Sequence, residues 1–342
     1  MNLDSQSMPS STVSSLENSR FLNALKCQNH EDRPPIWIMR QAGRYLPEYQ
    51  KLRASHTLEQ LFRDPEKIVE VTLQPLKRFP LDAAILFADI LHILLPLGCD
   101  VTFPQKGGPQ VSAPERLQEK DVAKTLDFVK SGIQLLKEEL KVPLIGFCGG
   151  PFTVAHYLLG KKPEKMLHQD PKGFHQLLEM ITDASLAYLQ MQIDAGVNAI
   201  QIFDSWAGTL PRAELEEFIL PTLKKLTSAL DVPTLIFSRG SAFYVQEFLS
   251  VGADGISFDA GRPLAEIRKE VPKQITVQGN LPPEFLYSPP EVIRRKTTEH
   301  LASMQGDPGF IMNLGHGMLP DIPVENVQTF IETVVTNSPL GA

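Results

Sequence analysis

The feature that most constrains the fold of this chain is a regular alternation of short apolar runs and long amphipathic segments. Eight runs, bounded by proline, glycine or aspartate, have the composition of buried strands: Pro35–Met39, Ala83–Phe87, Pro143–Phe147, Ala199–Phe203, Thr234–Phe237, Gly255–Phe258, Ile275–Gln278 and Gly309–Asn313. The clearest segments between them carry apolar residues at three- and four-residue steps, and these are Asp121–Leu140, Lys172–Ala195 and Arg212–Leu230. Because a parallel neighbour requires a crossover long enough to hold a helix, the alternation predicts a parallel α/β sheet.

The strand count favours one closed sheet over an open one. Eight strands that are apolar on both faces predict an α/β fold of the single (β/α)8 TIM-type barrel class. The turn after the first run, residues 40–44, reads Arg-Gln-Ala-Gly-Arg where a doubly wound dinucleotide fold would have its glycine-rich turn. A phosphate-binding G-x-x-x-x-G-K-[ST] loop is absent as well, so we expect no nucleotide cofactor.

The same pattern sets the expected domain boundaries. Residues 17–335 show no linker-like change in composition, which predicts one catalytic barrel domain. Residues 1–16 are rich in serine and are expected to be a disordered N-terminal tail, and residues 336–342 a short C-terminal tail. Leu97–Pro114, rich in glycine and proline, is expected to be a loop insertion after the second strand.

Charge and cysteine content exclude several classes of partner and compartment. The 342 residues include 33 Lys+Arg and 40 Asp+Glu, a formal net charge of −7, which argues against nucleic acid or an anionic membrane as partner. No apolar stretch reaches the roughly 20 residues needed to cross a bilayer. The three cysteines, Cys27, Cys99 and Cys148, form neither a disulfide framework nor a zinc motif, and the N-terminus resembles no secretory or transit peptide. We therefore expect a cytoplasmic protein without a metal site.

In a barrel the site is built where the strands end, so the residues after each run are the candidates. Arg40 and Arg44, with Arg53 nine positions beyond Arg44, form a candidate anion clamp, since guanidinium groups bind carboxylates with paired hydrogen bonds. The alternative is surface pairing with Glu48 and Asp64, which the spacing alone does not exclude.

Asp89 is the second candidate, because it stands in an apolar setting where an ionised carboxylate needs a partner. That partner is either a structural arginine or a substrate that is cationic or donates N–H groups. His316 lies between two glycines, which leaves room for a ligand, whereas His92 and His156 are expected to be satisfied core or helix-face residues. The strand-end residues Asp204, Ser205 and Asp259 could equally be helix caps.

Five sequence blocks carry a resemblance to a known family. They are Pro34–Tyr49 (PPIWIMRQAGRYLPEY), Phe87–Leu91 (FADIL), Gly146–Tyr157 (GFCGGPFTVAHY), Phe203–Gly208 (FDSWAG) and Asn313–Gly317 (NLGHG). In their order and amino-acid sequence they are similar to the signatures of the uroporphyrinogen decarboxylase family, and they are spread over roughly residues 17–335. The family is a homodimeric (β/α)8 barrel that uses no cofactor.

The resemblance implies an activity and a set of roles. It implies removal of the four acetate carboxyl groups of uroporphyrinogen III, giving coproporphyrinogen III and CO2 in haem and chlorophyll synthesis. Asp89 and Arg40 are then the catalytic residues, with Asp89 reaching the pyrrole N–H groups of the macrocycle. Substrate-binding positions carried over from the family are Arg40, Gln41, Ala42, Gly43, Arg44, Arg53, Asp89, Tyr157, Ser205 and His316. Trp206 stands where some members have histidine, a departure in the wall next to Ser205.

Three other functions compete with this hypothesis. A zinc-thiol or cobalamin-linked methyltransferase of the same barrel type needs a His-x-Cys and a later cysteine, and no cysteine follows Cys148. A barrel glycosidase needs a carboxylate after the seventh strand, where Gly279-Asn280 stands instead. A non-catalytic tetrapyrrole-binding protein would keep the arginines and lose the catalytic carboxylate, so the presence of Asp89 disfavours it.

Overall fold

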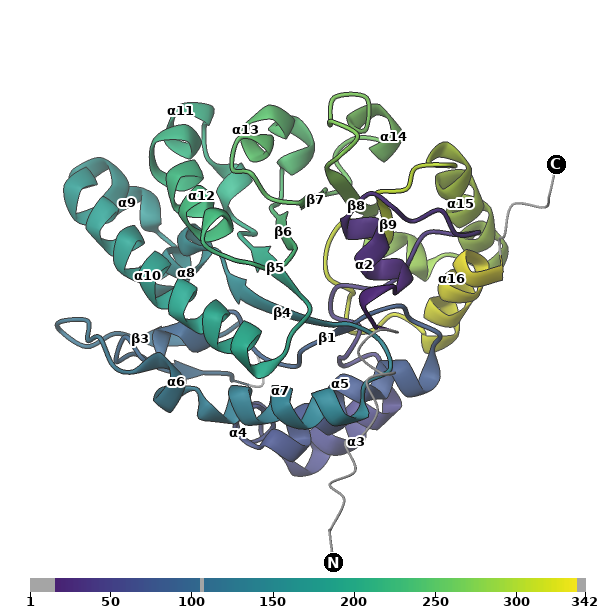
Figure 1. The fold of residues 1–342 in the computed structure, drawn as a ribbon. Helices are drawn as coiled ribbons and strands as arrows, with labels where there is room; N and C mark the ends of the chain where they lie inside the picture. Colours follow the sequence, from purple (N-terminus) through teal and green to yellow (C-terminus); the bar gives the residue numbers. More distant parts are fainter. Residues whose placement is uncertain (1–15, 105–107, 337–342) are drawn as a thin grey trace, which may run out of the picture.

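Seven parallel strands form one strongly curled sheet in the computed structural model, which describes residues 16–104 and 108–336 (Figure 1). In spatial order the strands are β1 (Ala84–Ile85), β4 (Leu144–Gly149), β5 (Ala199–Phe203), β6 (Thr234–Phe237), β7 (Gly255–Ser257), β8 (Thr276–Leu281) and β9 (Phe310–Leu314). They match seven of the eight predicted runs, and all their pairings are parallel. The predicted tails lie outside the described residues, apart from Leu16 and Thr336.

The first predicted strand, Pro35–Met39, is the exception: it contributes only an isolated bridge between Ile36 and Met312 of β9. Its carbonyl groups accept from backbone N–H groups, whereas three of its own N–H groups donate to side chains. Ile36 N donates to Asp82 Oδ2 at 2.8 Å, Ile38 N to Gln41 Oε1 at 3.1 Å, and Met39 N to Asn313 Oδ1 at 3.0 Å. Because side chains satisfy these donors, the segment forms only part of a strand ladder. The expected eight-stranded sheet is thus a seven-stranded one with an irregular segment beside β9.

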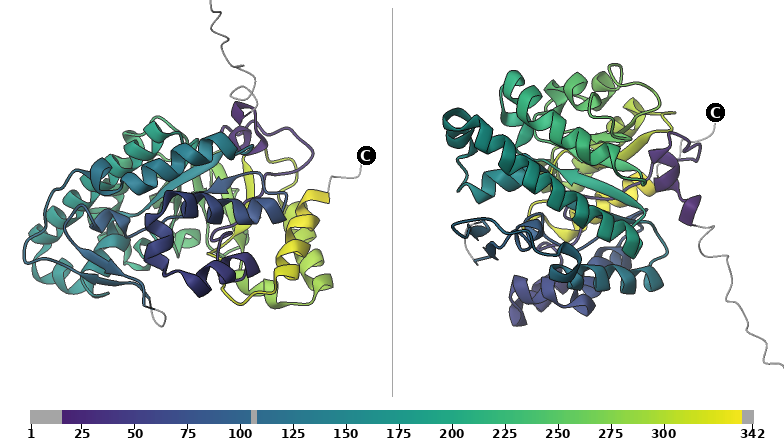
Figure 2. Two further views of the ribbon diagram at one scale, coloured as in Figure 1. Left: turned by 90° about the horizontal axis from the view of Figure 1, so that it is seen from below. Right: turned by 60° about the vertical axis from the view of Figure 1, so that its left-hand side comes forward.

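Helices cover the outer face of the curled sheet, and Figure 2 shows this arrangement from two further sides. The longer ones are α3 (Pro47–Ser55), α5 (Pro65–Arg78), α7 (Asp127–Glu139), α8 (Pro151–Leu158), α10 (Pro171–Ala195), α12 (Leu220–Ser228), α15 (Pro290–Ser303) and α16 (Val324–Thr336). The shorter ones are α2 (Arg20–Leu25), α4 (Leu58–Arg63), α6 (Val122–Thr125), α9 (Pro163–Gln169), α11 (Arg212–Glu214), α13 (Val245–Leu249) and α14 (Leu264–Ile267). Proline in the first turn and a side-chain cap from Asp64 or Asp170 start α5 and α10, as expected for helix N-termini.

Two of the three predicted helical segments are interrupted. Asp121–Leu140 divides into α6 and α7 at Leu126, and Arg212–Leu230 contains one widened turn at Leu215–Ile219 between α11 and α12. Lys172–Ala195 lies within the single helix α10. The insertion Leu97–Pro114 contains a small antiparallel pair, β2 (Asp100–Thr102) and β3 (Gln110–Ser112).

Inside the curled sheet, side chains from the strands and from segment 35–39 are hydrogen-bonded to one another. Gln278 Nε2 donates to Ser257 Oγ at 2.8 Å and to Gln201 Oε1 at 3.2 Å, and its Oε1 accepts from Trp37 Nε1 at 2.8 Å. All four side chains are fully buried. A buried network with its partners in place fixes one arrangement of the strands that contribute to it.

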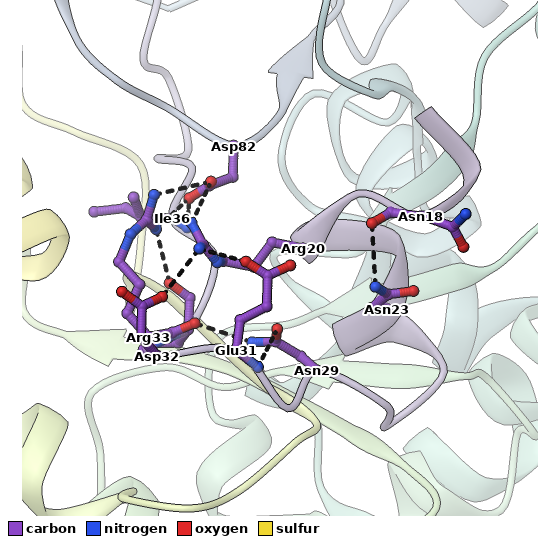
Figure 3. A network of polar contacts seen from close by, with 10 residues as sticks. Asn18, Arg20, Asn23, Asn29, Glu31, Asp32, Arg33, Ile36 and Asp82 are labelled. Atoms are coloured by element: carbon purple, nitrogen blue, oxygen red, sulfur yellow. Dashed lines mark hydrogen bonds and ion pairs between the residues drawn. The ribbon is translucent and has the colours of Figure 1, made fainter. Parts of the chain in front are cut away.

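Ion pairs attach the N-terminal segment to the start of β1 (Figure 3). Arg33 binds the Asp82 carboxylate with both guanidinium nitrogens, at 2.6 and 3.1 Å, and Arg20 reaches the same carboxylate at 3.4 Å. Arg20 also pairs with Glu31 and Asp32. This network lies at the amino end of β1, so the carboxyl ends of the strands are left for the site.

Candidate active site

A cavity of about 270 Å³ opens at the carboxyl ends of the strands. Its walls are mostly apolar, and its five polar or charged side chains come from segments far apart in the sequence: Arg40, Asp89, Tyr157, Ser205 and His316. Each of the five is a residue that the sequence proposed for the site. Small-molecule sites have this character, an apolar concavity with a few convergent polar groups.

Arg40 lines the cavity and has an unusual backbone conformation. Its φ of +64° lies in the left-handed region, which costs a non-glycine residue about 1 kcal/mol. A Cβ on Gly317 would lie 2.6 Å from Arg40 Cδ and 2.8 Å from its Nε, so the arginine side chain passes directly over the glycine backbone. Burial lowers the pKa of Arg40, and the nearby Tyr157 and Asp89 act in the opposite direction. The guanidinium remains charged at neutral pH.

Asp89 follows β1 in a tight turn that fixes its carboxylate. Its Oδ1 accepts a hydrogen bond from Leu91 N at 2.8 Å, and its backbone N donates to His92 Nδ1 at 3.3 Å. Burial raises the pKa of Asp89 to about 6, although the Leu91 N–H and the charge of Arg40 both lower it. Within the described residues, Asp89 forms no ion pair. It is therefore mainly ionised at pH 7, without a cation in direct contact.

The other three polar residues lie on different elements around the opening. Tyr157 belongs to α8, Ser205 follows β5, and His316 follows β9. The His316 ring meets the edge of Phe237 with centroids 5.8 Å apart. Burial, Arg40 and Arg239 lower the pKa of His316, in that order, so its imidazole is neutral at pH 7.

Arg44 and Arg53 lie outside the cavity lining. Both lower the pKa of Tyr49, which burial raises, and the Tyr49 ring contacts Phe87 of the cavity wall at 6.0 Å between centroids. Of the three arginines only Arg40 lines the cavity, although the charge of Arg44 is close enough to Arg40 to help lower its pKa.

The surface pairs suggested for these arginines are not formed in the described part of the chain. Glu48 pairs with Arg78, and Asp64 caps α5 by accepting from Glu66 N and Lys67 N. Arg53 instead donates to the backbone carbonyl of His56.

The residues between Arg40 and Arg44 have separate roles. The Gln41 side chain is buried. Its Oε1 accepts from Ile38 N within the same loop, and its Nε2 donates to Ala83 O at 3.2 Å. Ala42 lines the cavity, and Gly43 does not. Gln41 therefore supports the loop from behind, with its amide turned away from any ligand.

Two residues for which the sequence suggested structural roles, His92 and Asp204, hold the site in place. His92 is buried with its pKa lowered to about 3 by burial, so the neutral ring accepts the Asp89 N–H. Asp204 is fully buried and accepts from Thr153 N and Thr153 Oγ1 at 2.8 and 2.7 Å, which joins the end of β5 to the start of α8. The signal for Asp204 was its position after a strand. His92 was expected to be a satisfied core or helix-face residue, and it is buried and hydrogen-bonded.

Residues 16–104 and 108–336 contain no group of three His, Cys, Asp or Glu side chains placed to hold a metal ion. The three cysteines are free, and burial raises the pKa of Cys99 to about 11 and that of Cys148 as well. Over the same residues no helix is long and apolar enough to cross a membrane.

Fold and cavity together define a class: an α/β protein with a curled parallel sheet and a site at the carboxyl ends of its strands. A solved methyltransferase from Methanosarcina mazei has the same fold, with a TM-score of 0.80 and 21% identity over 93% of this chain and 97% of that one. A B12-independent methionine synthase from Shewanella sp. W3-18-1 is more distant, with a TM-score of 0.59 and 11% identity over 88% and 95%. At these identities the likeness concerns the fold alone.

Sequence comparison identifies the family. The model of the uroporphyrinogen decarboxylase (URO-D) family matches residues 16–336. The uroporphyrinogen decarboxylase of Protochlamydia amoebophila (strain UWE25) is 44% identical, over 96% of this chain and 94% of the relative. That of Alkalilimnicola ehrlichii (strain ATCC BAA-1101 / DSM 17681 / MLHE-1) is 40% identical over 96% of each. The chain belongs to the uroporphyrinogen decarboxylase family and is a carboxy-lyase. The family and enzyme class predicted from the sequence are confirmed.

Proposed function

We propose that this chain removes the carboxyl groups from the four acetate side chains of uroporphyrinogen III, giving coproporphyrinogen III and CO2 in haem and chlorophyll synthesis. Family membership supports this substrate. The observation that carries the chemistry is that one apolar cavity is lined by both a carboxylate without an ion-pair partner, Asp89, and a guanidinium, Arg40.

The reaction needs a sink for the electrons of the breaking C–CO2 bond, and the substrate supplies one. A proton added to the pyrrole α-carbon beside an acetate arm makes a delocalised cation. The bond electrons then move toward the ring as CO2 leaves, forming an exocyclic methylene. Protonation of that methylene and loss of the proton first added restore the pyrrole. The net change is CH2COO⁻ plus one proton to CH3 plus CO2, so no oxidant or reductant enters.

Asp89 stabilises the cation in this scheme. Its carboxylate is ionised at pH 7 and accepts pyrrole N–H groups, while the Leu91 N–H holds it in place. A carboxylate about 4 Å from a unit positive charge, at an effective dielectric near 20, contributes on the order of 4 kcal/mol, or roughly a thousandfold in rate.

Arg40 binds an acetate carboxylate beside Asp89. A guanidinium that stays charged makes charge-assisted hydrogen bonds to a carboxylate and is a poor proton donor, because its pKa in water is above about 12. We assign Arg40 to orienting the reacting arm and a water molecule next to it to delivering the proton. Tyr157, Ser205 and His316 provide the remaining polar contacts, and Arg44 and Arg53 attract carboxylates at the outer side of Phe87.

Anaerobic incubation with uroporphyrinogen III, followed by oxidation and chromatography of the porphyrins, tests the activity. The expected result is the stepwise appearance of seven-, six-, five- and four-carboxyl porphyrins. Binding of the octacarboxylate without any of these products would support a carrier instead and reject the proposal.

The finer structural expectations are part of the same proposal. Segment 35–39 takes the place of the eighth strand, since Met312 N donates to Pro35 O and Asp82 N to Ile36 O, both at 2.9 Å. The unit is then a (β/α)8 barrel, with residues 17–335 as one catalytic domain. We further propose a cytoplasmic homodimer that works without a cofactor. Sedimentation showing only a monomer would contradict the dimer.

A further inference from the structure

Arg239 is an arginine beside the cavity that the scheme above leaves without a role. It stands two residues after the end of β6, and Phe237, the last residue of that strand, lines the cavity. Among the residues that line the cavity, Arg40 is the one arginine or lysine, and the proposed substrate carries eight carboxylates. One guanidinium cannot hold the charge of that ligand, so other cations near the opening are of interest.

The Arg239 backbone is fixed by close contact between two strand-end loops. Gly208 N donates to Ser238 Oγ at 2.8 Å. A Cβ on Gly208 would lie 2.1 Å from Arg239 O, and a Cβ on Gly240, whose φ is +81°, would lie 2.5 Å from Gly208 O. The loop after β5 and the loop after β6 therefore touch backbone to backbone, with no space for a side chain between them.

Trp206 holds the Arg239 side chain. The guanidinium carbon lies 5.0 Å from the Trp206 ring centre, within cation–π range. The indole is in turn stacked on His156, with ring centres 4.5 Å apart and planes inclined by 13°. Among the described residues Arg239 has no carboxylate partner, so its fork of N–H donors is held in place and still open to a ligand.

Arg239 is also near the polar side of the cavity. His316 lines the cavity, and Arg239 and Arg40 both contribute to the lowered pKa of its imidazole. Arg239 is exposed to solvent, as a residue at the rim that receives a charged group has to be.

We propose that Arg239, held by Trp206, is a second carboxylate-binding residue for the tetrapyrrole at the rim of the cavity. This assignment rests on the proposed function. It gives Trp206 a positioning role. It also places a cation at the end of β6, on a loop that is far in sequence from the loop that carries Arg40.

The test compares Arg239→Met and Arg239→Lys with the unaltered chain, using uroporphyrinogen III under anaerobic conditions. Arg239→Met is expected to raise KM by about ten- to a hundredfold, the effect of losing one charge-assisted hydrogen bond, with kcat changed by less than about threefold. Arg239→Lys should recover most of the loss because it keeps the charge. Trp206→Ala should raise KM less than Arg239→Met does. Arg295→Met, which removes an exposed charge paired with Glu299 on α15, controls for net charge and should leave KM unchanged.

A second readout separates this proposal from the function on which it rests. The affinity for uroporphyrin III, the oxidised octacarboxylate, is measured by its own fluorescence, and it should fall in Arg239→Met by the same factor as KM rises. If the unaltered chain binds uroporphyrin III but yields no decarboxylated product, the function fails, and the affinity ratio still judges Arg239. Unchanged KM and affinity in a folded Arg239→Met variant would overturn the proposal, as would equal changes in Arg295→Met.

Discussion

Replacing Asp89 with asparagine should nearly abolish turnover while leaving the protein at least as stable at neutral pH. The amide keeps an oxygen to accept the Leu91 N–H, which Asp89 Oδ1 now accepts at 2.8 Å. It loses the charge that stabilises the substrate cation, which is worth on the order of 4 kcal/mol, so kcat should fall roughly a thousandfold.

The ionised Asp89 lowers the free energy of unfolding, whereas a buried carboxylate that has an ion-pair partner usually raises it. The pKa of Asp89 is raised to about 6 from an ordinary 3.8, so folding favours the protonated acid. The stabilisation from this group is complete below about pH 3.8 and is lost as the pH rises through about 6. At pH 7 the ionised side chain costs the wild type about 3 kcal/mol, since each pH unit of difference is about 1.4 kcal/mol. Asparagine cannot ionise and avoids that cost.

Two measurements check this reasoning. Single-turnover decarboxylation gives the loss in rate, and denaturant unfolding at pH 7 and at pH 4.5 gives the difference in free energy of unfolding between variant and wild type. The variant's advantage should shrink toward pH 4.5. Asp183→Asn, a substitution of an exposed carboxylate on α10, serves as the control and should change neither quantity appreciably. An Asp89→Asn variant with a kcat within tenfold of wild type, or one that is clearly less stable at pH 7, would refute the argument.

Three further predictions concern the same site. The kcat/KM of the wild type should fall about tenfold per pH unit below pH 6 as Asp89 becomes protonated, and a flat profile down to pH 5 would contradict this. Gly317→Ala should lower kcat/KM at least about tenfold with little change in Tm, because the new methyl displaces Arg40 from its place over the glycine; a wild-type rate would show that this contact is dispensable. Gln41→Leu should lower the free energy of unfolding by about 1–3 kcal/mol in urea titrations, since it leaves the buried Ile38 N–H without its acceptor; an unchanged midpoint would mean that the loop finds another partner.

Seven of the eight strands could be read from the sequence because buried parallel strands leave continuous apolar runs. The eighth could not, and the reason is visible in its hydrogen bonds. The run Pro35–Met39 looks like a strand, but its N–H groups go to Asp82, Gln41 and Asn313. Asp82 and Asn313 lie more than forty residues away, and no local pattern shows that their side chains will accept the N–H groups that a full strand ladder would use.

The site was predictable to the extent that it depends on strand ends. Of the polar residues that line the cavity, Asp89, Ser205 and His316 follow strands, Arg40 follows the irregular segment 35–39, and Tyr157 lies in α8 beyond β4; family motifs contain all five. The spacing of Arg40, Arg44 and Arg53 did not show which of the three would line the cavity. Arg40 takes a left-handed φ and turns over Gly317, whereas the chain beyond it enters α3 and carries the other two arginines to Tyr49. The left-handed φ of Arg40 is a feature that the spacing of the arginines does not predict.

The electrostatics of the cavity indicate what kind of ligand it is built to hold. Arg40 lowers the pKa of Asp89, yet burial has the larger effect and the net change is upward. The nearby positive charge thus does not offset the burial of the carboxylate, and burial of the guanidinium likewise lowers the pKa of Arg40. A ligand that is anionic at its edge and becomes cationic at its centre would relieve both at once. The relief at Asp89 is greatest when the positive charge is fully formed, which is the condition for catalysis as opposed to tight binding of the ground state.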